Sequence, residues 1–187
     1  MTAIGTARMT ARQFMELPED PPEVRRELAN GEIIVSPSPS FAHGRADSVL
    51  NSLLRRHVKL HKLGEIAGDV DTIVSRQTVR RPDLFYFSTA RLHLVSAKGI
   101  HGPPDLCVEF VSPGSEHVDR VQKFAEYAAY GVAHYWIIDP VARTAEAYNL
   151  TNGTYTLVAR GSGEDVVRFP PFADLDIPLG ELWWPPK

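Results

Sequence analysis

The sequence predicts an α/β or α+β domain in which a mixed central β-sheet is flanked by helices, with a helix and a hairpin near the N-terminus. Two short and almost wholly apolar runs, 105–111 and 134–139, are typical of central strands covered on both faces. A helix is expected between them, at 116–130, and Gly131 can end it in the left-handed conformation. If the two strands are parallel, this unit is a right-handed crossover. The length of 187 residues favours one domain, 1–187.

The first elements follow from local signals. Thr10 and Gln13 have the spacing of a capping box, so a short helix begins there, and prolines 18, 21 and 22 end it. Asn30-Gly31 is a strong signal for a two-residue hairpin, and it joins the expected strands 26–29 and 32–36.

The longest helix is expected at 40–62, after a Ser-Pro connector at 36–40. Its apolar residues recur at helical spacing and give the helix one apolar face; they are Val49, Leu50, Leu53, Leu54 and Val58. Strands are expected next at 65–67, 70–75 and 83–87.

The last regular elements are two strands, 144–150 and 155–159, which form a hairpin around Thr151-Asn152-Gly153. The remainder, to Lys187, is rich in proline and is expected to be irregular.

Composition restricts the classes of function. The net charge of −3 and the pI of about 6.2 argue against a strong, non-specific nucleic-acid binder, which is usually basic. The single cysteine, Cys107, excludes an internal disulfide and fits a reducing compartment. Because the sequence shows no secretory signal and no run long enough to span a membrane, we expect a cytoplasmic protein that does not enter the membrane.

Three carboxylates stand out as candidate metal ligands. Glu109 lies in the middle of an apolar strand, where a buried carboxylate is costly unless it is paired, protonated or bound to a metal. Asp83 begins another strand, and Glu27 lies in the strand before the first hairpin. Three acids on separate strands could hold Mg²⁺ or Mn²⁺. A Pro-Asp-Leu tripeptide occurs at both 82–84 and 104–106, so the motif alone does not distinguish Asp83 from Asp105.

Lys123 is the candidate cation for this site. Measured from the loop that joins strand to helix, Glu109 lies about 10 Å back along the strand and Lys123 about 10 Å along the helix. If the helix folds over the strand, Lys123 can therefore point at the carboxylates. The alternative is that Lys123 only forms an exposed pair with Asp119, four residues earlier.

Other motifs are weak or absent. Arg80 and Arg81, beside Asp83, are placed to meet a phosphate. The sequence contains no Cys/His spacing that indicates zinc, no Gly-rich phosphate loop and no nucleophile elbow.

Taken together, the motifs resemble the Uma-type restriction endonuclease family, a branch of the PD-(D/E)XK nuclease superfamily. The matching segments cover about 9–150, in the family's order. They include Arg81-Pro82-Asp83-Leu84 and Val108-Glu109, and those that weigh most are the Ser-Pro segments, Ser36-Pro37-Ser38-Pro39-Ser40 and Val111-Ser112-Pro113, and Tyr135-Trp136-Ile137-Ile138-Asp139-Pro140.

The resemblance implies a restriction-endonuclease-like core that binds a divalent metal. It matches Glu27, Asp83 and Glu109 to the family's acids and favours Asp83 over Asp105. Val111 occupies the usual lysine position, two residues after the glutamate, and Lys123 matches a displaced lysine.

The first hypothesis is therefore an endonuclease that cuts DNA, preferably double-stranded, with Mg²⁺ or Mn²⁺ held by Asp83 and Glu109. A homodimer would suit cleavage of both strands. The alternatives are a binding or interaction module that no longer turns over, and a nuclease that acts on RNA.

Overall fold

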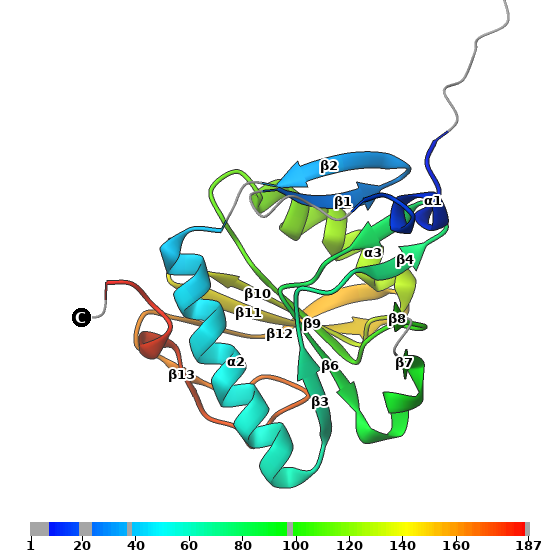
Figure 1. Ribbon diagram of the computed structural model, residues 1–187. Helices are drawn as coiled ribbons and strands as arrows, with labels where there is room; N and C mark the ends of the chain where they lie inside the picture. Colours follow the sequence, from blue (N-terminus) through cyan, green and yellow to red (C-terminus); the bar gives the residue numbers. More distant parts are fainter. Residues whose placement is uncertain (1–7, 19–23, 37–38, 97–98, 186–187) are drawn as a thin grey trace, which may run out of the picture.

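The computed structural model describes residues 8–18, 24–36, 39–96 and 99–185, and most of the expected elements are present (Figure 1). Prolines 21 and 22 and part of the Ser-Pro connector lie outside these ranges. The expected class is confirmed, because a mixed six-stranded sheet has the strand order β12-β11-β10-β9-β6-β3 and is flanked by helices. Among the described helices, none is long and apolar enough to cross a membrane.

The N-terminal elements follow their local signals closely. Helix α1 (Ala11–Met15) begins at Thr10, which forms a complete capping box with Gln13. Strands β1 (Arg25–Ala29) and β2 (Glu32–Ser36) are antiparallel neighbours. Asn30 and Gly31 both have positive φ, at 50° and 82°, as a type I′ turn requires.

These strands belong to a second, smaller sheet with the order β2-β1-β5-β4. Its other members are β4 (Thr72–Ser75) and β5 (Thr78–Arg80). The sequence predicted one strand at 70–75 and missed β5, because the turn between them, Arg76-Gln77, contains no residue typical of tight turns.

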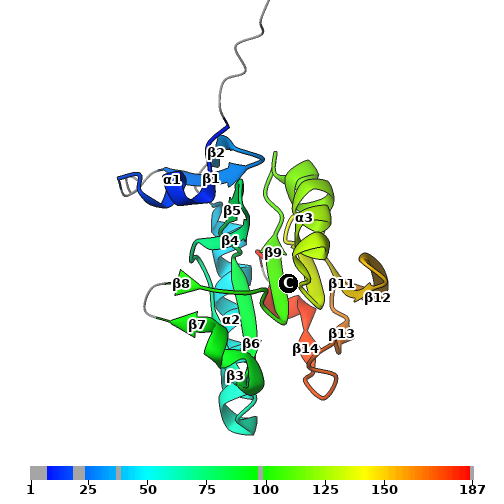
Figure 2. The same ribbon diagram turned by 90° about the vertical axis from the view of Figure 1, so that its right-hand side faces the viewer.

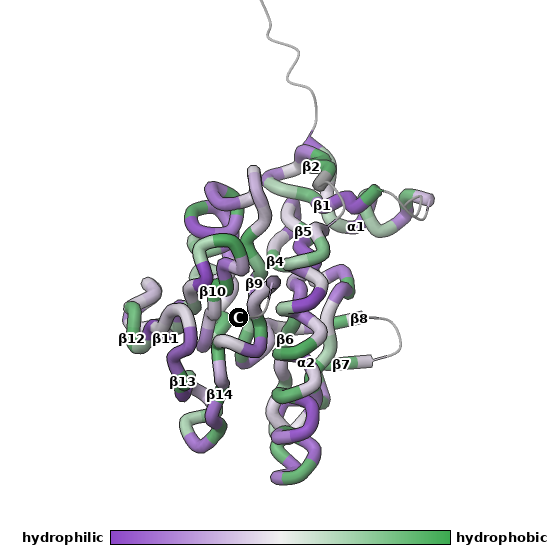
Figure 3. Tube along the Cα trace, turned by 90° about the vertical axis from the view of Figure 1, so that its left-hand side faces the viewer, coloured by the Kyte–Doolittle hydropathy of each residue, from purple (hydrophilic) through white to green (hydrophobic). Residues whose placement is uncertain are grey.

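Helix α2 (Phe41–His61) covers one face of the large sheet. Ser40 caps its first turn, and Lys62 ends it in the left-handed conformation. The helix alternates between hydrophobic and hydrophilic residues in Figure 3, and its apolar face packs on β3 (Gly64–Ala67), β6 (Leu84–Ser88) and β9 (Leu106–Phe110). A 3₁₀ turn (Thr89–Leu94) and the short strands β7 (Val95–Ser96) and β8 (Gly99–Ile100) follow β6.

The crossover from β9 to β10 (His134–Asp139) is present, and the two strands are parallel. The connecting helix has two parts, a π-helical segment (Val118–Gln122) and α3 (Lys123–Tyr130), which ends at Gly131 with φ of 91°. Figure 2 shows α3 on the opposite side of β9 from α2. The side chains of β9 point alternately to the two faces of the sheet, as expected. Leu106 packs in the hydrophobic cluster between the sheet and α2 (the α2 core), and Cys107 packs in the cluster between the sheet and α3 (the α3 core).

The C-terminal third follows expectation in its regular elements. The hairpin of β11 (Thr144–Thr151) and β12 (Thr154–Ser162) is present and extends the sheet. Within the described range 163–185, the regular elements are β13 (Val166–Val167), β14 (Ile177–Pro178) and a 3₁₀ turn (Leu179–Glu181). This segment nevertheless fills the α2 core with buried side chains, which include Phe169, Phe172, Leu179, Leu182 and Trp183.

Candidate active site

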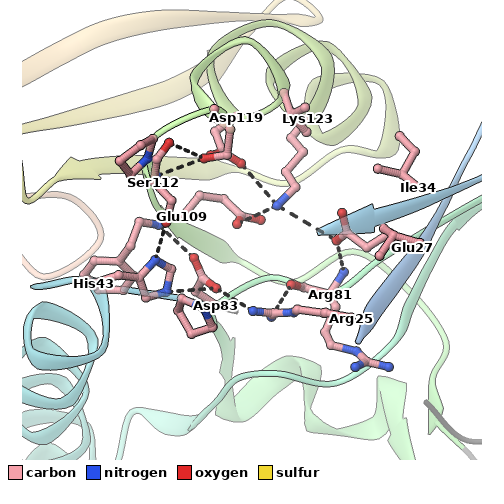
Figure 4. A pocket seen from close by; sticks show the side chains of 17 residues that line it. Arg25, Glu27, Ile34, His43, Arg81, Asp83, Glu109, Ser112, Asp119 and Lys123 are labelled. Atoms are coloured by element: carbon pink, nitrogen blue, oxygen red, sulfur yellow. Dashed lines mark hydrogen bonds and ion pairs between the residues drawn. The ribbon is translucent and has the colours of Figure 1, made fainter. Parts of the chain in front are cut away.

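A pocket of ≈ 240 Å³ lies where α2, β1, β6, β9 and the helix before β10 meet (Figure 4). The three acids and the lysine predicted from the sequence all line it: Glu27, Asp83, Glu109 and Lys123. They come from four different elements, so only the folded chain brings them together. Asp105, the other member of the repeated tripeptide, does not line this pocket.

The register of β6 and β9 places the two central acids face to face. Leu84 pairs with Val108 in this antiparallel ladder. One residue further on, Asp83 therefore lies opposite Glu109, at the end where β6 begins and β9 ends. Directly opposed residues have Cβ atoms about 4.5–5.5 Å apart, so one cation can reach both carboxylates.

Asp83 is fixed through both carboxylate oxygens. Its Oδ2 accepts the backbone N–H of Phe110 at 2.8 Å, and its Oδ1 lies 3.3 Å from a guanidinium nitrogen of Arg25. His43 Nε2 lies 3.5 Å from the same Oδ1. Burial alone would raise the pKa of Asp83, but His43, Lys123 and Arg25 outweigh it and lower the pKa to about 2. Asp83 is therefore a carboxylate at neutral pH.

Glu109 and Lys123 form a buried pair. Lys123 Nζ lies 2.7 Å from Glu109 Oε2, and Tyr127 donates its hydroxyl to Oε1 at 2.7 Å. Burial raises the pKa of Glu109 well above its usual range, while Lys123 acts in the opposite direction. Burial would lower the pKa of Lys123, but the charges of Glu109, Glu27 and Asp119 raise it, so the ammonium stays protonated.

Lys123 also makes the pair with Asp119 that the sequence offered as the alternative. The distance from Nζ to Asp119 Oδ1 is 3.2 Å, yet neither side chain is on the surface, since Asp119 is 4% and Lys123 7% exposed. Both line the pocket together with Glu109. The alternative of an exposed pair is therefore wrong: the pair with Asp119 exists, but it is buried, and the ammonium joins three acids, Asp119, Glu109 and Glu27.

The π-helical segment lies directly before Lys123. The Lys123 N–H bonds to the carbonyl of Val118, five residues back rather than four. Such segments widen the helix and often occur at functional sites. Sequence periodicity did not reveal it, because one five-residue segment changes the helical period too little to be seen in the spacing of apolar residues.

Glu27 is buried beneath this group. Its Oε1 accepts the backbone N–H of Arg81 at 2.7 Å and lies 3.9 Å from Lys123 Nζ. Its Oε2 pairs with Arg80 at 3.1 Å. Burial alone would raise the pKa of Glu27, but Lys123 and Arg80 lower it. Glu27 therefore supports Lys123 electrostatically and also fixes the backbone beside Asp83.

The expected phosphate contact of Arg80 is wrong. Arg80 is 0% exposed, and its guanidinium is held by Glu27 and, at 2.6 Å and 3.0 Å, by both oxygens of Glu126. A group enclosed in this way cannot reach a ligand. Arg81 does line the pocket, although its guanidinium also pairs with Asp71 at 2.8 Å.

Sequence reasoning missed two side chains at the site. Arg25, 23% exposed, links Asp83 to Asp69 and lines the pocket. His43, in the first turn of α2, places Nδ1 3.1 Å from the hydroxyl of Ser112. The only signal for His43 is its position three residues after the Ser-Pro connector 36–40, one of the segments that resemble the family, and Arg25 has no signal of this kind.

The donor set fits a hard divalent cation such as Mg²⁺ or Mn²⁺. It consists of two opposed carboxylates on adjacent strands, with a backbone carbonyl at the end of β9, and such cations prefer oxygen ligands. The described residues that line the pocket include no cysteine and one histidine, His43, which lies on the far side of Asp83 from Glu109 (Figure 4).

The fold resembles that of a known crystal structure. That structure is described as a putative nuclease belonging to DUF820 from Anabaena variabilis, and it superposes with a TM-score of 0.77 at 22% identity, over 94% of this chain and 97% of that one. The sequence itself matches, over residues 11–180, the model of the Uma2 family, described as putative restriction endonuclease. The chain belongs to this family. No curated protein compared with the chain matches it significantly. The family match extends thirty residues beyond 150, where the resemblance in the sequence ended, and includes most of the segment that closes the α2 core.

Proposed function

We propose that the protein is a metal-dependent nuclease that hydrolyses phosphodiester bonds in DNA. The observation that supports this most strongly is the opposition of Asp83 and Glu109 beside the buried ammonium of Lys123. Membership of the Uma2 family agrees with it. A pocket of ≈ 240 Å³ has room for a phosphodiester group and several waters, since each water occupies about 30 Å³.

Asp83, Glu109 and the carbonyl of Phe110 would hold Mg²⁺ or Mn²⁺. When bound, the cation would polarise the phosphate and make a water more acidic. Asp83 suits this role because it stays ionised, with its orientation fixed by the N–H of Phe110.

Lys123 is suited to orient the attacking water and to stabilise negative charge that develops on the phosphate. A preorganised donor inside a pocket shielded from water acts strongly on such charge. Asp119 and Glu27 hold the ammonium in place from two other directions. The roles of ligand and charge stabiliser are thus divided between the strands and the helix.

The phosphate contacts proposed from the sequence change accordingly. Arg81 and Arg25 both line the pocket and are the candidates for contact with a phosphate. Arg80 instead holds Glu27 in place through a hydrogen bond. Because the net charge is −3, affinity for DNA should be modest and should fall steeply with salt.

One observation favours the alternative of a binding module without turnover. Each carboxylate oxygen of Asp83 and Glu109 already contacts a protein donor. Each oxygen keeps a second lone pair, but the positive charge of Lys123, 2.7 Å from Glu109 Oε2, opposes the entry of a cation.

The test is Mn²⁺-dependent cleavage of double-stranded DNA and of RNA by the wild type, Lys123→Gln and Glu109→Gln, with the exposed Lys59→Ala as the matched control. Metal binding is measured on each protein by calorimetry. We expect wild-type and control cleavage to be equal, and both site variants to be slower by roughly a hundredfold or more. Lys123→Arg should not restore the rate, because a planar guanidinium does not replace a compact ammonium.

Other outcomes are equally informative. Cleavage that survives both site substitutions points to a contaminating nuclease and contradicts the proposal. Metal binding without cleavage of any DNA or RNA would support the binding module instead. Cleavage of RNA alone would retain the chemistry and change the substrate. Light scattering on the same samples tests the proposed homodimer.

A further inference from the structure

A second cluster of metal-ligating side chains lies at the other end of α2. His57 and His61 are one helical turn apart near its C-terminus, and Asp174 comes from the turn after Phe172. One ligand atom from each residue lies within 4.8 Å of the other two. At about 1.5 Å per residue, the fourteen residues from His43 to His57 separate this cluster from the pocket by roughly 20 Å.

The buried member of the cluster has an unsatisfied nitrogen. His57 is 7% exposed, and among the described residues its Nε2 has no hydrogen-bond partner. Asp174 Oδ1 lies 3.3 Å from that nitrogen but does not meet hydrogen-bond geometry. A buried polar atom without a partner is costly, so an occupant that satisfies it is favoured.

Both sides of the cluster are held in place by the core. His57 packs edge-on against Phe172, with the ring centroids 5.6 Å apart. The turn that presents Asp174 is closed by a hydrogen bond from the Leu175 N–H to the Phe172 carbonyl, and both of those side chains pack in the α2 core. His57 and the backbone turn that carries Asp174 are therefore held in place, while the exposed side chains of His61 and Asp174 adjust around the ion.

The donor set selects a different class of metal from that of the pocket. Two imidazoles and one carboxylate are typical of Zn²⁺ sites, whereas Mg²⁺ takes oxygen ligands. In a tetrahedral zinc site with bonds of about 2.0–2.1 Å, neighbouring ligand atoms lie about 3.3 Å apart. The separation of 3.3 Å between His57 Nε2 and Asp174 Oδ1 matches that edge.

We propose that His57, His61 and Asp174 form a site for Zn²⁺ that fastens the end of α2 to the segment after β13. The position at the C-terminus of α2 also suits a cation, because the helix dipole is negative there. A fourth coordination position stays open to water. This site is independent of the proposed nuclease function.

The experiment measures Zn²⁺ binding to the full chain after treatment with a chelator. It uses competition with a chromophoric chelator, together with visible spectra of the Co²⁺ form. The starting protein carries Asp83→Asn and Glu109→Gln, so that the pocket does not contribute. The test variants add His61→Gln or Asp174→Asn, and the matched controls add the exposed His93→Gln or Asp176→Asn.

We expect one equivalent of Zn²⁺ in the starting protein and in both controls, and binding at least about tenfold weaker in both test variants. Zn²⁺ should raise the unfolding temperature of the starting protein and not that of the test variants, because a ligand that binds only the folded state stabilises it. Co²⁺ should give the intense visible bands of a tetrahedral site.

Equal affinity in all five proteins, or no stoichiometric binding to the starting protein, would overturn the proposal. If the starting protein does not fold, wild type replaces it, and the test is the loss of one equivalent in His61→Gln.

Discussion

Two identical Pro-Asp-Leu tripeptides, 82–84 and 104–106, occupy equivalent places at opposite ends of the β6–β9 pair. Asp83 accepts the N–H of Phe110 at the end of β9, and Asp105 accepts the N–H of Ser88 at the end of β6, at 2.8 and 2.7 Å.

Each aspartate also faces an arginine. Arg25 lies 3.3 Å from Asp83, and Arg91 lies 3.5 Å from Asp105. Because the strands are antiparallel, the same three residues generate the same local structure twice. In both places the aspartate fastens the start of one strand to the end of its neighbour.

The two ends differ in the residue opposite the aspartate. The register places Glu109 opposite Asp83 and Phe87 opposite Asp105. A second carboxylate gives one of these ends a pair of candidate oxygen ligands, while a phenyl ring gives the other end none. The local motif thus fixes a carboxylate in position, and its neighbour across the ladder decides what the carboxylate can do.

The largest effect expected from this comparison is on catalysis. Asp83→Asn keeps an acceptor for the Phe110 N–H but removes the charge that a cation needs, so the cleavage rate should fall by roughly a hundredfold or more. Asp105→Asn should leave the rate unchanged. Rates with Mn²⁺ on a common DNA substrate provide the measurement. A comparable loss in both variants would mean that Asp83 also acts only through stability.

A smaller effect is expected on DNA affinity when the two arginines are exchanged for glutamine. Arg25 lines the pocket and Arg91 does not. Arg25→Gln should therefore weaken binding and lower the slope of log affinity against log salt by about 0.9, the value for one phosphate contact on duplex DNA. Arg91→Gln is the matched control and should leave the slope as in wild type. Fluorescence anisotropy over a salt series measures both slopes, and equal slopes would exclude a docked phosphate at Arg25.

The smallest effect is on the pH dependence of stability, and it concerns Asp47 in α2, whose carboxyl group is influenced by the charge of Asp83. Burial and, secondarily, the charge of Asp83 raise the pKa of Asp47 from 3.8 to about 6. The folded protein therefore keeps a proton, between about pH 4 and pH 6, that the unfolded chain releases. The free energy of unfolding should decrease as the pH rises through this window.

Asp47→Asn should remove this dependence. The full shift corresponds to about 3 kcal/mol, and partial exposure reduces the expected gain to about 1 kcal/mol at pH 8. At pH 4 or below the gain should be close to zero. Urea unfolding at both pH values is the measurement. A gain that does not vary with pH would show that the charge of Asp47 is not its cause.

The sequence predicted the fold where local signals are strong. The turn at Asn30-Gly31, the cap at Thr10 and the apolar β9 and β10 each depend on a few adjacent residues, and each was found in place. Strand β5 and the π-helical segment were missed, because neither has a distinctive composition or period.

The candidate site was predictable in part for the same reason. Glu109 stood out because a carboxylate in an apolar strand needs a partner. The burial of Arg80 could not be predicted, because the charge of a residue does not show whether its side chain faces solvent. Contacts between distant segments, such as Arg25 with Asp83 or His57 with Asp174, have no local signature.

The segment after β12 has a consequence for how the chain reaches its native state during synthesis. Trp183 donates to the carbonyl of Gly163 at 2.6 Å, Trp136 donates to that of Pro170 at 2.8 Å, and Phe169 and Phe172 cover the ring of Trp136. When all strands of the large sheet have been synthesised, the side chains that complete the α2 core have therefore not yet been added to the chain. Until they emerge, the nascent chain exposes an apolar surface of the kind that chaperones bind. Premature termination near residue 160 should therefore produce an aggregation-prone fragment rather than a smaller folded protein.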